Sequence, residues 1–280
     1  MATFFSYFTQ MLLLLCLPPF LFGFVAFGAH SLYGMLVGEQ EGRPLLLAVS
    51  ALSTPLRELG HVIACVICLH RIEDVRFLNI HDPDGEWGYV EHSYNPRNPL
   101  AILGNFLYAL GPVATGLSAV LIIFSLCFYG VLPPFFSEIE ALNAAGAGFT
   151  AYVKAAVSLI PAMFTVGGAP MVLRILGCAL LLAVCFGIYI SFSELKDALG
   201  GFAVFAVLAA LATGVLMLFD DRVMRIAFGG IRAYATGVTA LFSVVLLCFA
   251  VLLIVGLVFR TFCTLFSRSE DDQSNQIEGR

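Results

Sequence analysis

Three ionisable residues lie close together inside an otherwise apolar stretch of the chain. Arg57, Glu58 and His61 are enclosed by the hydrophobic run from Pro44 to Leu69. A charged side chain at the centre of a bilayer costs about 2.5–3.5 kcal/mol even on the scale derived from insertion experiments, and such residues usually mark functional sites. The stretch therefore indicates a site rather than a simple membrane anchor.

The spacing of these residues is that of a known metal motif. On a helix, Arg57 and His61 share one face four residues apart, and Glu58 precedes His61 by three residues. In the H-E-x-x-H zinc motif, two histidines at this spacing hold the metal and the glutamate acts as general base. Here Arg57 stands at the position of the first histidine.

The segment matches the longer pattern Thr-Pro-x-His-Glu-Leu-Gly-His at its other fixed positions, as Thr54-Pro55-Leu56-Arg57-Glu58-Leu59-Gly60-His61. The chain therefore resembles the membrane-embedded zinc metalloproteases of the site-2 protease type. The resemblance implies a zinc cofactor, Glu58 as the catalytic base and His61 as a metal ligand.

Two later segments extend this resemblance in the expected order. Residues 104–112 are similar to the Gly- and Pro-containing segment that packs beside the catalytic helix in this family, with Asn105 and Pro112 as structural residues near the site. Small residues there permit close helix approach, and Asn105 is expected to hydrogen-bond across helices. Residues 191–200 resemble the family's Ser-x-x-Asp segment. Glu194 takes the position of the acidic third metal ligand, and Asp197 follows one turn later as a second acidic candidate.

A catalytic zinc needs about three protein ligands and an open position for water. Arg57 cannot be a ligand, because its guanidinium has no lone pair to donate and stays charged. An alternative role is to replace the positive charge of the metal by pairing with Glu58 or Glu194, which would leave a metal-free polar cluster. Cys65 and Cys68 follow His61 on one helical stripe and are possible replacements, although buried cysteines more often serve as packing residues. His70 and His92 are further candidates through proximity in sequence alone.

Composition defines the broad class. Hydrophobic residues make up 60% of the 280 residues and charged residues 12%, and the mean hydropathy is +0.95. These values predict an all-α, multi-pass integral membrane protein whose partners include membrane lipid. The chain has no basic patch for nucleic acid. The eight cysteines lie within or beside apolar runs, which favours free thiols.

We expect one transmembrane domain over residues 1–266, followed by a polar tail, 267–280, that is disordered. The last four residues resemble a protease-recognition sequence left by an expression vector. The apolar runs predict about six spans, near residues 8–28, 45–69, 100–132, 171–190, 199–219 and 233–259.

Local signals refine this picture. We expect the first helix to kink or break at Pro18-Pro19. Two interpretations of Pro55 are equally open: Ser53 or Thr54 caps a helix with Pro55 in its first turn, or Pro55 only kinks a helix that continues through it. Residues 138–154 predict an interfacial helix or loop.

Residues 70–98 are the only long polar stretch before the tail. Asp82-Pro83-Asp84-Gly85 signals a turn between possible strands at 75–78 and 87–90. In site-2-type proteases a sheet near the catalytic helix is thought to align the substrate as an added strand, and this hairpin resembles one. An interfacial cap without a substrate role is equally compatible with the sequence.

Three functions remain open at this level. The first is a zinc protease with an altered ligand set that cleaves a transmembrane or membrane-associated peptide. The second is a catalytically silent relative, a pseudoprotease, that binds transmembrane segments as clients. The third is a small transporter that uses the Arg57-Glu58-His61 cluster to handle protons or an anion; the absence of a visible internal repeat weakens it.

Overall fold

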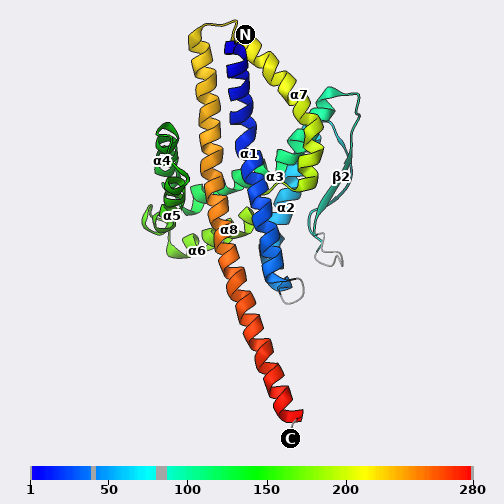
Figure 1. Ribbon diagram of the computed structural model, residues 1–280, viewed down its shortest axis with the longest axis vertical. Helices are drawn as coiled ribbons and strands as arrows, with labels where there is room; N and C mark the ends of the chain where they lie inside the picture. The colour runs from blue at the N-terminus through cyan, green and yellow to red at the C-terminus, as the bar shows by residue number, and fades with distance from the viewer. Residues whose placement is uncertain (1, 39–41, 80–86, 279–280) are drawn as a thin grey trace.

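The computed structural model describes residues 2–38, 42–79 and 87–278, and the side chains of these ranges from residue 3 to residue 265. Within them the chain forms eight helices and one two-stranded sheet (Figure 1). The elements are α1 (Ala2–Val37), α2 (Arg43–Ile67), β1 (Arg71–Arg76), β2 (Tyr89–Ser93), α3 (Pro99–Cys127), α4 (Leu132–Ala144), α5 (Phe149–Thr165), α6 (Met171–Phe186), α7 (Phe192–Leu216) and α8 (Asp221–Glu278). The predicted all-α class is confirmed, with a small hairpin between α2 and α3.

Four helices in the described ranges are long and apolar enough to cross a membrane: Thr3–Val37 of α1, α3, α7 and Asp221–Leu265 of α8. The expected number of about six is not confirmed. Helix α6 is apolar but has only 16 residues, which is short for a bilayer about 30 Å thick. Helix α2 has 25 residues, but the ionisable residues in its middle make it less apolar.

Several boundaries differ from the expected ones because helices continue through their prolines. Helix α1 is a single helix that includes Pro18-Pro19, so it is not broken there. Helix α2 begins at Arg43 with Pro44 in its first turn, and Pro55 lies in its interior. Ser53 is therefore no N-cap; its hydroxyl donates to the Val49 carbonyl within the same helix, at 3.0 Å.

Helices α1 and α8 lie side by side and run in the same direction, and α8 projects well beyond the rest of the molecule (Figure 1). Helix α8 continues to Glu278, through most of the segment 267–280 for which composition predicts disorder. That disorder stays a prediction. Helices α4 and α5 together replace the single interfacial helix or loop expected over 138–154.

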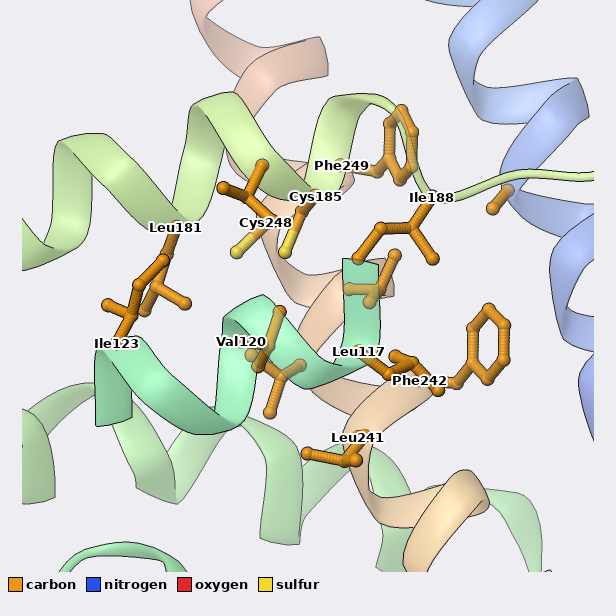
Figure 2. Packing of buried hydrophobic residues seen from close by; sticks show 14 of the residues in the cluster. Leu117, Val120, Ile123, Leu181, Cys185, Ile188, Leu241, Phe242, Cys248 and Phe249 are labelled. Carbon is orange, nitrogen blue, oxygen red and sulfur yellow. The ribbon is translucent and has the colours of Figure 1, made fainter. Parts of the chain in front are cut away.

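The main core lies where α3, α6 and α8 meet, as Figure 2 shows. Val120 of α3, Leu181 of α6 and Phe242 of α8 are each at most 2% exposed. Between apolar helices in a membrane, such contacts stabilise the fold through close van der Waals packing. This core holds α6 and the connection after it, which carries part of the candidate site.

Helices α2 and α3 approach each other closely at a pair of glycines. A Cβ atom at Gly60 would lie 2.5 Å from the carbonyl carbon and oxygen of Gly111, so only glycine fits at this crossing. Next to it, the Thr115 hydroxyl of α3 donates to the Leu56 carbonyl of α2 at 3.2 Å. The small residues of the 104–112 segment thus allow the close packing that the sequence predicts.

The hairpin pairs β1 and β2 antiparallel, with Arg71 opposite Ser93 and Arg76 opposite Tyr89. The strands begin and end at other residues than the expected 75–78 and 87–90, because pairing continues towards the ends of α2 and α3. The predicted turn at 82–85 lies outside the described residues.

Candidate functional site

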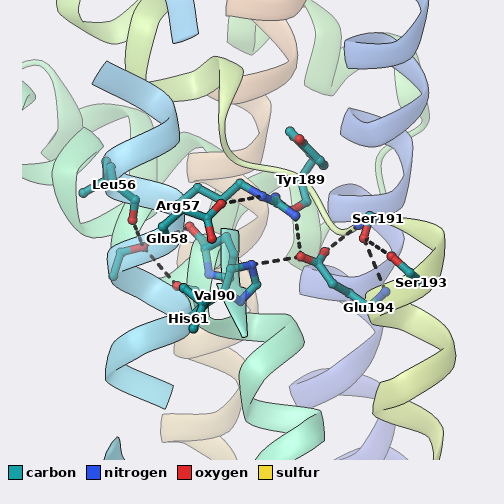
Figure 3. Close-up of polar contacts among 12 residues, drawn as sticks. Leu56, Arg57, Glu58, His61, Val90, Tyr189, Ser191, Ser193 and Glu194 are labelled. Carbon is teal, nitrogen blue, oxygen red and sulfur yellow. Dashed lines mark hydrogen bonds and ion pairs between the residues drawn. The ribbon is translucent and has the colours of Figure 1, made fainter. Parts of the chain in front are cut away.

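The structure brings together the residues of the two motif segments (Figure 3). Arg57, Glu58 and His61 lie in the middle of α2, and Glu194 lies in the first turn of α7. The side chains of Glu58, His61 and Glu194 are all buried, at 5%, 2% and 8% exposed. Buried ionisable groups need partners, because desolvation of an isolated charge is unfavourable. They form one connected cluster.

Glu194 is held by the cap of its own helix. The Ser191 hydroxyl accepts the Glu194 backbone N–H at 3.3 Å, and Glu194 Oε2 accepts the Ser191 N–H at 2.7 Å. This is a capping box, which satisfies two otherwise unpaired N–H groups at a helix start. With Oε2 engaged in this way, Oε1 is left to face α2.

The Arg57 guanidinium fills the space between the two acidic side chains. Its Nη2 donates to Glu194 Oε1, its Nη1 donates to the Tyr189 carbonyl at 3.0 Å, and its Nε lies 3.8 Å from Glu58 Oε1. The guanidinium carbon also lies 4.1 Å from the centre of the Tyr189 ring, a cation–π distance. One cation therefore contacts both carboxylates.

His61 is oriented as a metal-ligating histidine would be. Its Nδ1 lies 3.1 Å from the Tyr108 carbonyl, and its Nε2 lies 2.9 Å from Glu194 Oε1, the oxygen that Arg57 also contacts. The Tyr108 ring stacks on the imidazole with 4.0 Å between ring centroids. Ligating histidines commonly use one nitrogen for a carbonyl and present the other to the metal.

Pro112 explains why the Tyr108 carbonyl is available. In a regular helix this carbonyl would accept the N–H of residue 112, but proline has none. The carbonyl is bonded by the His61 ring instead. Pro112 is therefore expected to act as a structural residue near the site, because its missing N–H leaves this carbonyl to the imidazole.

A cavity of about 300 Å³ lies beside Arg57 and Glu58. It lies between α1, α2, the hairpin and the α6–α7 connection, and it is lined by His30, Leu46, Ser50, Thr54, Arg57, Glu58, Trp87, Gly88, Phe186 and Tyr189. A Cβ atom at Gly88 would lie 2.6 Å from Thr54 Cγ2 and 3.0 Å from Glu58 Cγ. The hairpin backbone therefore abuts α2 directly beside Glu58.

Three other predicted residues lie apart from this cluster. Asp197 is exposed on α7, and none of the ion pairs among described side chains includes it. Asn105 is 8% exposed on α3, and the interhelical hydrogen bond expected for it is not formed with any residue that the structure describes. Cys68 is buried at the end of α2, away from His61.

Cys65 belongs to a second cluster that the sequence did not predict as such. Cys65, His70 and His92 each offer one ligand atom within 4.8 Å of the others. His92 comes from β2, and only strand pairing, with His92 opposite Ile72, brings it to the end of α2. No local pattern in the sequence signals this long-range pairing, and the sequence alone relates the two histidines to Cys65 only through proximity.

The residues at the first cluster do not fit a catalytic zinc. His61 and Glu194 supply two ligands where about three are needed, and the third position holds a cation. The one group of three metal-ligating side chains in the described part of the chain is the Cys65 cluster.

On the hairpin, the Tyr89 hydroxyl donates to Asp74 Oδ2 at 2.6 Å. This bond, together with the N–H of Val75, lowers the pKa of the Asp74 carboxyl. Partial burial, followed by the neighbouring imidazoles of His70 and His61, lowers the pKa of His92.

None of the family models, curated proteins and solved structures compared with the chain matches it. The likeness to site-2-type proteases therefore depends on the motif segments and on the contacts that their residues make.

Proposed function

We propose that the chain is a multi-pass membrane protein of the site-2 protease type that has lost its catalytic metal and binds membrane-associated peptides without hydrolysing them. The observation that carries the proposal is the contact of Arg57 Nη2 with Glu194 Oε1, the oxygen that His61 Nε2 also approaches. The four apolar helices support the membrane placement.

The chemistry at this contact favours a silent site. In a zinc enzyme, the dication would lie against His61 Nε2 and the acidic ligand and would activate a water. Arg57 places a guanidinium against that acidic oxygen instead, and a fixed cation there repels a dication. Arg57 also lies close to the Glu58 carboxylate, the expected base. A buried, paired charge cluster of this kind can hold a helix arrangement without performing chemistry.

Peptide binding is supported by the retained surroundings of the site. The cavity beside Glu58 is bounded by Trp87 and Gly88, which directly precede β2. A two-stranded sheet leaves outer backbone N–H and C=O groups that an extended peptide can pair with. A peptide added to the hairpin would pass the cavity next to α2.

The metal half of the proposal is tested by metal analysis of the purified full chain. The measurements use a Cys65→Ser background, so that metal bound by the second cluster does not contribute. We expect Cys65→Ser to hold little zinc and Cys65→Ser/Arg57→His to hold about one equivalent, which His61→Ala removes again. Full zinc in Cys65→Ser that disappears with His61→Ala would refute the loss of the metal.

The binding half is tested with a photo-crosslinking amino acid at Trp87 in reconstituted membranes. The probe is a synthetic single-span peptide with a Gly-Pro pair that disrupts its helix. The matched control position is Tyr129, which is aromatic and 76% exposed. We expect crosslinking at position 87 well above that at position 129; equal yields would contradict a specific peptide site.

A further inference from the structure

The second cluster joins three separate elements of the fold. Cys65 lies in the last turns of α2, His70 lies in the short link before β1, and His92 lies on β2. Their ligand atoms lie within 4.8 Å of one another, with Cys65 fully buried and His70 7% exposed. We propose that these three side chains bind a zinc ion that ties the end of α2 to the hairpin.

The hydrogen bonding of His70 is that of a metal ligand. Its Nε2 lies 2.7 Å from the Ala101 carbonyl, which can only accept, so Nε2 carries the hydrogen. The neutral ring then has its lone pair on Nδ1, which is buried and has no hydrogen-bond partner among the residues that the structure describes. A buried acceptor without a partner is unfavourable, and a metal ion at Nδ1 would supply the missing partner. A carbonyl bond at the other nitrogen is the usual way of fixing a ligating imidazole.

The neighbouring rings hold both histidines in place. The two imidazoles stack with centroids 5.0 Å apart, Tyr94 stacks on His70 at 5.2 Å, and Tyr108 packs against His92 at 4.4 Å. Gly104 of α3 provides the room, since a Cβ atom there would collide with the His70 ring. The cluster is therefore positioned from several sides rather than formed by mobile surface groups.

The donor set selects the kind of metal. One thiolate and two imidazoles suit zinc, which binds sulfur at about 2.3 Å and nitrogen at about 2.0–2.1 Å. Tetrahedral ligands at these distances are separated by roughly 3.3–3.6 Å, so the side chains would need to close by about 1 Å. Binding releases the thiol proton, because the thiolate is the ligand.

The three side chains leave the fourth zinc position to a water, and it is the place of the cluster in the fold that indicates a structural role. Glu58 precedes Cys65 by seven residues, which is about 10.5 Å along a helix, too far to act as a base on a metal-bound water here. The Tyr108 ring also lies between the clusters, in contact with both His61 and His92. An ion at Cys65, His70 and His92 would instead fix the hairpin, and with it Trp87 and Gly88, against α2.

The test is metal analysis of the full chain, purified in detergent after loading with zinc and dialysis. We expect about one equivalent in the wild type and its loss in Cys65→Ser and in His92→Ala. Cys127→Ser is the matched control, because Cys127 is also a buried free cysteine but lies outside the cluster. Cobalt loading should give a thiolate-to-metal charge-transfer band that Cys65→Ser abolishes, and Cys127→Ser should retain both metal and band.

The cluster variants also distinguish this inference from the proposed function. Absence of metal in the loaded wild type, or full retention in both Cys65→Ser and His92→Ala, would overturn the Cys–His–His site alone. Metal that is kept in those two variants but lost in His61→Ala would overturn the proposed function as well. If Cys65→Ser fails to fold, His92→Ala decides the matter, because His92 is only partly buried.

Discussion

The contact between Arg57 and Glu194 can be tested by removing the cation while leaving the carboxylate. In Arg57→Met, Glu194 keeps its capping box but loses its charged partner in a pocket where it is 8% exposed. Removing one partner of a buried ion pair typically destabilises a protein by about 3–5 kcal/mol. At about 2 °C per kcal/mol for a chain of this size, we expect the Tm to fall by about 6–10 °C.

A double variant separates the ion pair from the packing of the arginine stem. Arg57→Met/Glu194→Gln removes both charges. Its Tm should therefore be higher than that of Arg57→Met, by more than half of the decrease that Arg57→Met causes. Glu58 is unpaired from Arg57 in both variants, and its effect therefore cancels in the comparison. The assay is thermal unfolding of the detergent-solubilised protein, with Arg97→Met as control because Arg97 is exposed.

Two results would refute this reasoning. If Arg57→Met unfolds at the same temperature as Arg97→Met, the guanidinium does not stabilise the buried carboxylates. If the double variant is as unstable as the sum of the single changes, the two side chains are not coupled.

Three further predictions concern other contacts. Gly60→Ala should reduce stability by about 1–3 kcal/mol, because the new Cβ atom collides with the α3 backbone. Gly200→Ala, where the Cβ atom meets open space, should not reduce it, and thermal unfolding of the two variants makes the comparison. Arg174→Met should destabilise the chain by on the order of 3 kcal/mol in the same assay, because this buried arginine donates to three carbonyls of residues 163–169. Tyr89→Phe should raise the pKa of Asp74 towards its ordinary value, measured by carboxyl NMR titration. In the wild type, the Tyr89–Asp74 bond stabilises the hairpin at neutral pH, and this stabilisation is lost as the pH falls through the lowered pKa of Asp74.

The apolar composition and the motif spacing together predicted the all-α class and the residues that meet at the first cluster. The apolar composition predicts long helices, and the four-residue spacing places Arg57 and His61 on one face of a helix. The meeting with Glu194, 137 residues later, followed only from the resemblance. Local helix chemistry supports that meeting, because the Ser191 capping box aims Oε1 towards α2.

Other features were beyond the reach of local patterns. The helices continue through Pro18 and Pro55, because packing on neighbouring helices outweighs the missing N–H groups. Helices α2 and α6 are not among the four described helices that are long and apolar enough to cross a membrane, so the expected count of about six spans is not confirmed. The Cys65 cluster depends on strand register, which no short window of sequence specifies.

The geometry around His61 also explains why a single substitution is expected to recreate a metal site. Pro112 frees the Tyr108 carbonyl for Nδ1, which turns Nε2 towards Glu194 Oε1. A second histidine at position 57 would project from the same helical face one turn earlier, where the guanidinium now contacts that oxygen. We therefore expect Arg57→His to replace the ion pair by a third candidate zinc ligand beside His61 and Glu194.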